Sequence, residues 1–259
     1  MSKRVFSPDT MPEWRHGPGE TGSRTLTEQT YARLRTDIIE GLLAPGSKLR
    51  VDHLRGSYGV SAGTLREALT RLVSDALVTA EGQRGFRVSP ITLCDLEDLT
   101  RLRVHIETHA LRQAIRYGGE AWRQRLQASF IAMSAFEQPL MRRHREHWET
   151  LNTRFHEALL SGHDSPWTSR VLRLLTRQSE RYRSFALEVP GMTRDVHAEH
   201  TAIFELAMAG EEARAALALE AHICATPNLL IRALREGRLV LPGDAGGEGV
   251  GEAGLRKVG

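Results

Sequence analysis

The sequence has 259 residues, of which 41% are hydrophobic and 26% are charged, and its formal net charge is +3 at pH 7. This length predicts two domains that each bury a core, and the composition excludes a disordered or a membrane-spanning protein. No apolar run approaches the roughly 18 residues that cross a bilayer, and the first residues, MSKRVFSPDT, lack the apolar stretch of a secretory signal. We therefore expect a cytoplasmic protein without a membrane partner.

The charge and the cysteines narrow the function only slightly. A small positive excess is compatible with binding to a polyanion but does not establish it. Cys94 and Cys224 are the only cysteines, which excludes a cysteine-based metal motif. In a reducing compartment we expect both to be free thiols.

Hydrophobic periodicity predicts a winged helix-turn-helix domain over residues 25–90, after a flexible segment at 1–24. A Gly-Val-Ser turn at 59–61 separates the second and third helices. Ser61 suits the N-cap of the third helix, because its hydroxyl can accept a bond from an unpaired backbone N–H. Two short strands then flank a glycine-containing tip at 81–85. In chain order, the predicted elements are helices over 28–41, 52–58 and 62–74 and strands over 77–80 and 86–88.

Beyond the second strand, helical periodicity predicts an all-helical domain over 93–236, so that the protein as a whole is mainly α. Pro227 is expected to break or kink the last helix, since proline lacks a backbone N–H. Residues 237–259 are rich in glycine and are expected to be flexible. The predicted helices cover about 93–117, 120–137, 140–160, 166–187, 192–208 and 211–236.

The third predicted helix has one apolar and one polar side. Its leucines form the inner stripe, whereas Gly63, Thr64 and Arg66 lie near its N-terminal end on the outer side. Small residues and hydrogen-bond donors at this end suit a helix that enters the major groove of DNA. Arg84, at the tip of the hairpin, suits a contact with the minor groove or with a phosphate. The alternative is that these arginines belong to the solvated face of an ordinary helical domain.

The stretch GVSAGTLREALTRLVSDALVTAEGQRGFRVSP resembles the N-terminal domain of the GntR family of transcriptional regulators. The resemblance implies that Arg66 contacts the operator and that Gly85 is the glycine of the wing. Ala62 and Thr64 depart from the family pattern, in which arginine and proline are common, so the base preference does not carry over. The expected DNA-binding residues are Arg50, Ser61, Gly63, Thr64, Arg66, Arg71, Gln83, Arg84 and Gly85.

Three histidines and an asparagine of the helical domain suggest a metal site. Asn152 and His156 are four residues apart, so they share one face of a predicted helix. His200 and His222 belong to two other predicted helices, each beside an apolar stripe. Three imidazoles and an oxygen donor could bind a borderline divalent metal. The alternative is that each histidine is an ordinary core or surface residue.

The segments NTRFHEALLSG, EHTAIFELAMAGE and EAHI resemble the FCD ligand-binding domain of the FadR-type subgroup of the GntR family, over nearly all of residues 93–236. This resemblance implies a zinc-like divalent metal at the floor of an effector cavity. Its ligands are then Asn152, His156, His200 and His222. The neutral amide of Asn152 is a poorer ligand than a carboxylate. The segments LRVDHLRGSYGV, LVTAEGQRGFRV and ERYRSF are similar to the glutarate-responsive branch of the family.

We expect arginine and tyrosine side chains in the cavity to donate hydrogen bonds to a carboxylate effector. Arg103 and Glu107 match the R-x-x-x-E pattern of the family, and a planar guanidinium binds a carboxylate with two hydrogen bonds. The alternative is an intrahelical ion pair worth about 0.3–0.5 kcal/mol. Arg181, Tyr182 and Arg183 are expected to offer further donors to the effector.

The sequence therefore predicts a DNA-binding transcriptional regulator rather than an enzyme. We expect a homodimeric repressor of a catabolic operon, which a small carboxylate releases from double-stranded operator DNA. One alternative is a metal-dependent hydrolase, but the sequence contains no HExxH or similar motif. Another is a DNA-organising protein without an effector, which leaves the predicted cavity residues unexplained.

Overall fold

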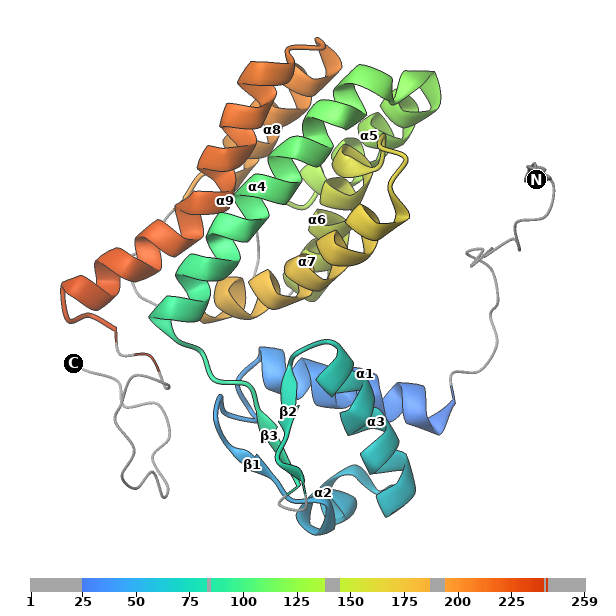
Figure 1. Ribbon diagram of the computed structural model, residues 1–259, viewed down its shortest axis with the longest axis vertical. Coiled ribbons are helices and arrows are strands. Elements are labelled where there is room, and N and C mark those ends of the chain that lie inside the picture. The colour runs from blue at the N-terminus through green and yellow to red at the C-terminus, as the bar shows by residue number, and fades with distance from the viewer. Residues whose placement is uncertain (1–24, 83–84, 138–144, 187–193, 240, 242–259) are drawn as a thin grey trace, which may run out of the picture.

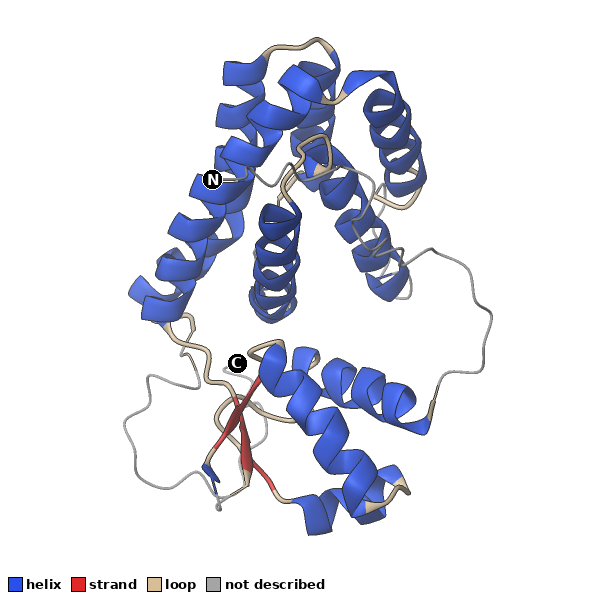
Figure 2. Cartoon of the chain, turned by 45° about the vertical axis from the view of Figure 1, so that its right-hand side comes forward, coloured by secondary structure: helices blue, strands red, loops and turns tan. Residues whose placement is uncertain are grey.

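The computed structural model describes residues 25–82, 85–137, 145–186, 194–239 and 241. Over these ranges the chain forms a small domain of helices and short strands, followed by a larger domain made of helices (Figure 1). Figure 2 shows the small sheet of the N-terminal domain beneath the helices of the C-terminal domain. The prediction of a mainly helical protein, with a winged helix-turn-helix followed by a helical bundle, is confirmed.

The N-terminal domain follows the predicted order of elements, with one additional strand. β1 has only two residues, so the sequence contains no alternation that could predict it. The sheet has the order β1-β3-β2, and both strand pairs are antiparallel, with Thr79 opposite Arg87. The elements are α1 (Leu26–Ile39), β1 (Lys48–Leu49), α2 (Val51–Tyr58), α3 (Ala62–Ser74), β2 (Val78–Ala80) and β3 (Phe86–Val88).

The starts of α1 and α3 are fixed by side-chain caps. Thr25 accepts a hydrogen bond from the Glu28 backbone N–H at 3.2 Å, and the Glu28 carboxylate accepts one from the Thr25 N–H at 3.0 Å. This capping box starts α1 two residues before the predicted start. Ser61 caps α3 as predicted, because its Oγ accepts from the Thr64 N–H at 3.1 Å. Gly59, with φ of +66°, ends α2 and makes the turn into α3.

The apolar stripe of α3 lies at the centre of the N-terminal core. Leu65, Leu69 and Leu72 are fully buried, and they pack in one cluster with Leu34 of α1 and Val88 of β3. Burial of each leucine side chain stabilises the fold by about 1.5–3 kcal/mol. Because this face of α3 is held in the core, the opposite face of the helix is available to a partner.

Helices α4 and α9 run side by side through the C-terminal domain (Figure 1). Trp122 and Phe155 are fully buried in its main core, and the Trp122 indole N–H donates to the Ala158 carbonyl at 3.0 Å. A Cβ atom on Gly162 would lie 2.7 Å from the Cα of Ala114, so only glycine fits where the end of α6 meets α4. The helices are α4 (Leu93–Tyr117), α5 (Gly119–Ser134), α6 (Arg145–Leu160), α7 (Pro166–Ala186), α8 (Val196–Met208) and α9 (Glu212–Arg235).

Pro227 does not break the last helix, because α9 continues through it to Arg235; the alternative, a kink at Pro227, stays a prediction. Pro227 is buried, so its apolar contacts help to offset the missing backbone hydrogen bond. None of the described helices is long and apolar enough to cross a membrane. Some of the predicted features lie outside the described residues. They are the segment 1–24, the helix starts at 140 and 192, and residues 242–259 of the tail.

Helix α7 contacts the N-terminal domain directly. Asp75 follows the last residue of α3, and its carboxylate accepts hydrogen bonds from Tyr31 of α1 and from Arg177 of α7. Its backbone carbonyl accepts another from the Gln178 side chain. We call these four residues the interdomain contact. The end of α3 is therefore fastened to a helix of the other domain.

The same helix holds the linker between the domains, residues 89–92. The Arg181 guanidinium donates to the carbonyl of Ser89 and, at 3.3 Å, to that of Pro90. A movement of α7 along its axis would therefore pull on the linker and on the end of α3 together.

The two cysteines are both free thiols. Cys94, in the first turn of α4, is exposed, and Cys224 is half-buried.

Candidate DNA-binding surface and metal-binding cavity

The N-terminal end of α3 presents the residues that were predicted to read DNA. Ser61, Gly63 and Arg66 are exposed. A Cβ atom on Gly63 would meet only the Ser61 Oγ, at 3.6 Å, so the fold itself does not require glycine here. The absence of a side chain lets a ligand approach the backbone closely. Because Asp75 at the other end of α3 contacts α7, this N-terminal end lies away from the C-terminal domain.

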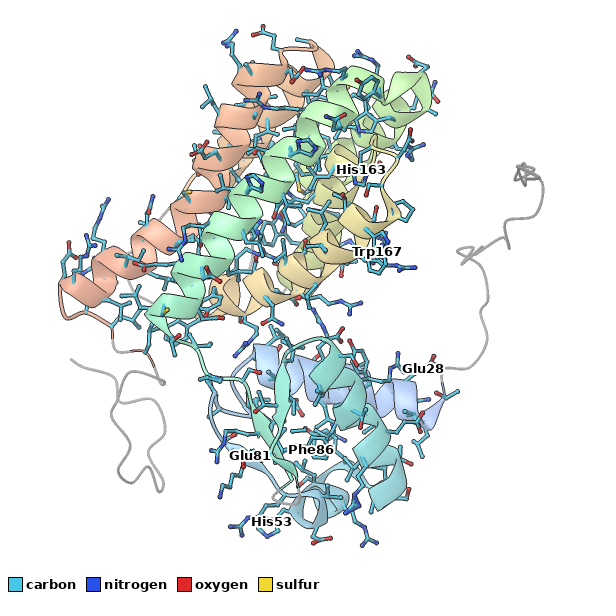
Figure 3. All side chains as sticks on the ribbon, viewed as in Figure 1. Glu28, His53, Glu81, Phe86, His163 and Trp167 are labelled. Carbon is cyan, nitrogen blue, oxygen red and sulfur yellow. The ribbon has the colours of Figure 1, made fainter. Side chains whose placement is uncertain are left out.

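The remaining arginines of this surface differ in position. Arg50 is exposed and precedes α2, whose His53 lies at the side of the domain farthest from the helical bundle (Figure 3). Arg71 lies in the last turn of α3, and its guanidinium carbon is 4.7 Å from the centre of the Tyr31 ring. Such cation–π stacking holds Arg71 beside α1. Arg71 is therefore separated from Arg66, and the structure does not bring the two together at one end of the helix.

The tip of the β2–β3 hairpin has the backbone of a tight turn. Gly82 and Gly85 have φ values of +59° and +96°, which side-chain-bearing residues rarely adopt. This geometry agrees with the role predicted for Gly85 in the wing. Gln83 and Arg84, which were predicted to contact DNA, lie outside the described residues.

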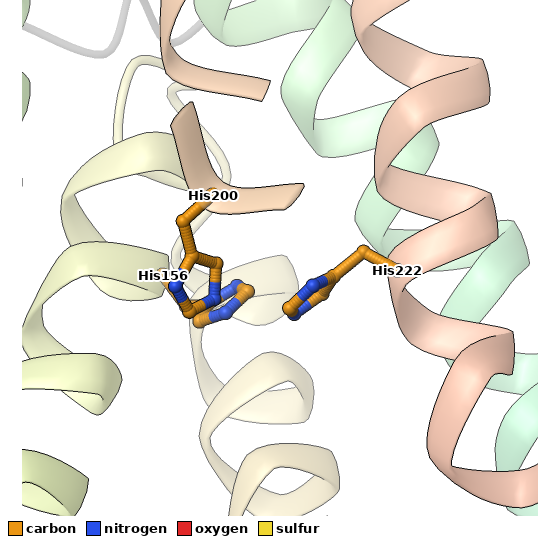
Figure 4. A group of neighbouring side chains, drawn as sticks. All are labelled: His156, His200 and His222. Atoms are coloured by element: carbon orange, nitrogen blue, oxygen red, sulfur yellow. The ribbon is translucent and has the colours of Figure 1, made fainter. Parts of the chain in front are cut away.

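His156, His200 and His222 meet inside the helical domain (Figure 4). They come from α6, α8 and α9, and their candidate ligand atoms all lie within 4.8 Å of one another. His200 is fully buried, and His156 is 8% exposed. Side chains that are far apart in the sequence therefore converge on one point, as their predicted positions on three helices required.

The hydrogen bonds of the histidines leave buried ring nitrogens that could bind a metal ion. His200 Nδ1 lies 2.7 Å from Glu137 Oε1, and His222 Nδ1 lies 2.9 Å from Glu199 Oε2. His200 Nε2 and His156 Nδ1 are buried without a hydrogen-bond partner among the described residues. Buried unpaired nitrogens are unfavourable, and a metal ion satisfies them. A carboxylate behind a histidine also orients the ring in metal sites. These residues therefore fit a divalent metal such as zinc.

Burial and neighbouring charges set the protonation of this cluster. Burial lowers the pKa of His156 well below 6.5, and the charges of His222 and His200 lower it further. Burial likewise lowers the pKa of His222 well below 6.5. Burial alone would raise the pKa of Glu137, but its hydrogen bonds with His200 and His197 outweigh burial and the pKa is lowered. Neutral imidazoles and an ionised carboxylate are the forms that metal binding requires.

A cavity of about 190 Å³ lies beside the histidines, lined by residues of α4, α6, α7 and α9, by the first residue of α8 and by the segment that leads into it. Asn152, which is 4% exposed, lines it together with His156 and His222. Of the residues predicted to bind the effector, Arg103, Tyr182 and Arg183 line the cavity. The cavity thus combines the histidine cluster with guanidinium groups, a combination suited to an anion.

Of the three arginines that were predicted for the effector, the two that line the cavity, Arg103 and Arg183, are each paired with a glutamate. Arg103 Nε lies 2.6 Å from Glu107 Oε1, and the side chains are 12% and 2% exposed. The intrahelical ion pair is therefore present, but it is buried and so differs from a weak surface pair. Glu107 is not among the described residues that line the cavity, and it orients Arg103 from behind. Arg183 pairs with Glu149, and its Nε is buried without a partner among the described residues.

Arg181 does not lie where the sequence predicts. It is not among the described residues that line the cavity, and its guanidinium binds the linker carbonyls. Successive helical residues are rotated by about 100°, so residues 181 and 183 point to different sides of α7. Tyr182 lines the cavity with its ring, whereas its hydroxyl donates to Asp95. The predicted group of three donors is thus divided between the cavity and the linker.

Sequence reasoning missed the residues that support the histidines. Arg194 donates to Glu199 Oε1 at 2.7 Å and to the His222 carbonyl at 2.8 Å, which fixes both groups beside the cavity. Glu199 directly precedes His200, and a carboxylate next to a candidate ligand is a signal that could have been used. Glu137 has no such signal, because it is 63 residues from the histidine that it orients.

Two family descriptions match most of the chain. Residues 26–88 match "Bacterial regulatory proteins, gntR family", and residues 98–225 match "FCD domain". The first range coincides with the winged helix-turn-helix domain, and the second contains all three histidines of the cluster. The match to the first description supports α3 as the helix that reads DNA, and the match to the second supports the cavity as a ligand site.

Individual relatives are similar over most of their length. The uncharacterized HTH-type transcriptional regulator BphR of Paraburkholderia xenovorans LB400 is 42% identical over 203 residues, which are 77% of this chain and 83% of that protein. The HTH-type transcriptional repressor GlaR of Escherichia coli K12 is 30% identical over 198 residues, or 74% and 90% of the two chains. The structure of E. coli McbR/YncC superposes with a TM-score of 0.63 at 21% identity, covering 83% and 99%, and supports the fold.

Proposed function

Because the chain belongs to the GntR family and carries an FCD domain, it is a DNA-binding transcriptional regulator, and we propose that it is a repressor which a small carboxylate releases from its operator. The similar protein GlaR is named a repressor, which supports this direction of control. The proposal places the protein in the cytoplasm, where it controls a catabolic operon. It assigns the histidines a ligand-binding role and no catalytic one, because the similar proteins are regulators.

The proposed DNA contact is made by the N-terminal end of α3. Gly63 and Thr64 let the helix approach the bases, while Arg66 reaches a base edge and Arg50 a backbone phosphate. Two copies of the chain form a homodimer, which sets its two α3 helices about 34 Å apart on a near-palindromic operator. The spacing of these two helices then decides the affinity for the operator.

The proposed effector site is the cavity beside the histidine cluster. Asn152, His156, His200 and His222 would hold a divalent metal, for which zinc fits the three imidazoles. The metal would supply positive charge that attracts a carboxylate. Arg103 is fixed by Glu107 and offers the remaining edge of its guanidinium to the same carboxylate. The buried, unpaired Nε of Arg183 offers a further donor.

Helix α7 provides the connection between this cavity and α3. Tyr182 and Arg183 line the cavity on one face of the helix. Arg177, on another face, and Gln178, one turn before Tyr182, hold Asp75 at the end of α3. A carboxylate that changes the position of Arg183 therefore acts on the same helix that holds the DNA-reading element. It can shift the equilibrium only as far as its affinities for the two arrangements differ.

The linker gives a second connection to the cavity. Leu96, Tyr182 and Ala186 line the cavity and also belong to an apolar cluster that contains Ile91 of the linker. Packed clusters of this kind transmit displacements, because their interiors are dense and resist compression. A ligand in contact with these residues would thus reposition the linker as well as α7.

The observation that carries the proposal is that one helix contacts both the cavity and the end of α3. The test uses the full-length protein with DNA from upstream of its own gene and a random duplex of equal length, at moderate ionic strength. We expect slower migration of the upstream fragment alone, and its release when Zn²⁺ and a carboxylate are added. Equal binding to both duplexes would contradict the proposal.

A further inference from the structure

The cavity beside the histidines has a polar end and an apolar end. Its polar side chains gather where the histidines meet, and its lining becomes apolar along α4, α7 and α9 away from that point. The polar and apolar lining residues of these helices are Arg103 and Leu96 on α4, Arg183 and Ala186 on α7, and His222 and Leu229 on α9. These three helices thus carry their apolar lining on the side away from the histidines.

The apolar ends of these helices lie together. Leu96 of α4, Ala186 of α7 and Leu230 of α9 pack in one apolar cluster. Figure 1 shows the start of α4 beside the C-terminal half of α9, which agrees with this packing. Seven residues separate Leu96 from Arg103 (103 − 96), which corresponds to about 10 Å along the helix. The cavity is therefore amphipathic over roughly the length of a medium-chain acid.

The positive charges of the cavity are confined to its polar end. Among the described lining residues, Arg103, Arg183 and Arg194 are the cationic ones. Arg194 donates to the carbonyl of His222 at 2.8 Å, and Arg103 lies about two turns along α4 from Leu96 of the apolar cluster. Each arginine is already paired with a glutamate: Arg103 with Glu107, Arg183 with Glu149, and Arg194 with Glu199. The described lining offers no cation to a charge at the apolar end.

From this lining we infer that the effector is a monocarboxylate with an apolar body, which lies with its carboxylate at the histidines and its body against Leu96, Leu99 and Leu229. The inference rests on the proposed function, because it refines the class of carboxylate. Burial of an apolar body in this half of the cavity is favourable. A second carboxylate against these leucines would be desolvated without a counter-ion among the described lining residues, which is unfavourable. The sequence similarity to a glutarate-responsive branch favours the opposite, a dicarboxylate.

The test compares two acids of equal chain length. Hexanoate and adipate both have six carbons, but adipate has a second carboxylate in place of the terminal methyl group. Each acid is titrated into the full-length protein with one equivalent of Zn²⁺, and binding is measured by calorimetry. We expect hexanoate to bind at least about tenfold more tightly than adipate, since only adipate must desolvate a second charge.

A substitution at the apolar end supplies the matched control. Leu229→Lys places a cation where the second carboxylate of adipate would lie, so we expect this variant to bind adipate at least as tightly as hexanoate. Leu217→Lys introduces the same charge at a 64% exposed position of the same helix and should keep the preference for hexanoate. Zinc binding by both variants checks that the helical domain is intact.

The possible results of this test distinguish a wrong choice of monocarboxylate from a wrong proposal of a carboxylate effector. Adipate binding as tightly as hexanoate to the unchanged protein would overturn the inference while leaving a carboxylate effector in place. A preference for hexanoate that Leu229→Lys leaves intact would also overturn the placement of the apolar body. If neither acid binds the zinc-loaded protein, the carboxylate effector of the proposed function is itself wrong.

Discussion

The carboxylate of Asp75, at the end of α3, forms an ion pair with the guanidinium of Arg177 in α7. The side chains are 12% and 42% exposed, so the contact is half-buried and contributes about 1 kcal/mol or less to stability. Its position matters more than its strength. It joins the C-terminal end of α3, the helix proposed to read DNA, to the helix that lines the cavity.

Loss of this ion pair should weaken the response to the effector more than the binding of DNA. We expect Arg177→Gln to bind the operator nearly as tightly as the unchanged protein, because Arg177 is remote from the N-terminal end of α3. The effector should then weaken operator binding by less than about threefold, against the 5- to 150-fold typical of allosteric coupling. The measurement is the ratio of operator dissociation constants with and without effector. Arg173→Gln, exposed on the same helix, is the control and should respond normally.

Glu137 should determine metal affinity without touching the metal. Its carboxylate lies 2.7 Å from His200 Nδ1 and orients that ring. Glu137→Gln should lower the affinity for Zn²⁺ about 10- to 100-fold, as is typical when such an orienting carboxylate is lost. Competition with a fluorescent zinc chelator measures the change. Glu157→Gln, an exposed position next to His156, should leave the affinity unchanged. Equal affinities in all three proteins would show that Glu137 has no such role.

The buried histidines should make the metal-free protein less stable in acid. The pKa values of His156 and His222 are held well below 6.5 in the folded protein, chiefly by burial. Below pH 6.5 the unfolded chain therefore binds more protons than the folded protein. The free energy of unfolding should decrease as the pH falls, by about 1.4 kcal/mol per pH unit for each histidine. Above pH 6.5 this contribution is constant. Urea unfolding at several pH values between 5 and 8 measures the slope.

Substitution of one histidine tests the origin of that slope. His156→Gln should reduce the pH dependence by the share of one group, whereas His53→Gln, at an exposed position of α2, should leave it unchanged. A slope that is the same in all three proteins would mean that other groups cause the loss of stability in acid.

The two arginines of α3 should differ in their importance for DNA binding. Arg66 is exposed near the N-terminal end of the helix, whereas Arg71 stacks on Tyr31 beside α1. Arg66→Ala should cost about 1–3 kcal/mol of operator affinity, or roughly 5- to 150-fold, and should reduce the preference for the operator. Arg71→Ala should weaken binding to operator and random DNA by similar, smaller factors. Mobility-shift titrations with both duplexes measure these effects, and the reverse order of losses would refute the assignment.

Local signals in the sequence predicted most of the fold. Ser61 was recognisable as a cap from the turn before it, and the stripe of Leu65, Leu69 and Leu72 predicted the buried face of α3. The capping box of Thr25 was equally local and was overlooked. Pro227 does not break α9, because burial in the tertiary structure outweighs the local preference of proline. Sequence patterns therefore predict an element well when its causes lie within a few residues.

The candidate site was predictable only in part, for the same physical reason. His156, His200 and His222 could be chosen by their positions on apolar faces and by resemblance, and they do converge. Glu137 could not be chosen, because the fold alone brings it to His200. Arg181 was assigned to the cavity as a donor together with Arg183, although the helical rotation separates them and Arg181 binds the linker.

The central claim is that the cavity and the DNA-reading end of α3 are energetically coupled through α7 and the linker. Reciprocity makes this directly measurable, since an effector that weakens operator binding must itself bind more weakly to the operator complex by the same factor. We would titrate hexanoate into the zinc-loaded protein alone and saturated with operator. The account predicts a weaker affinity in the complex, by the factor that hexanoate imposes on operator binding. Identical affinities in the two titrations would contradict it.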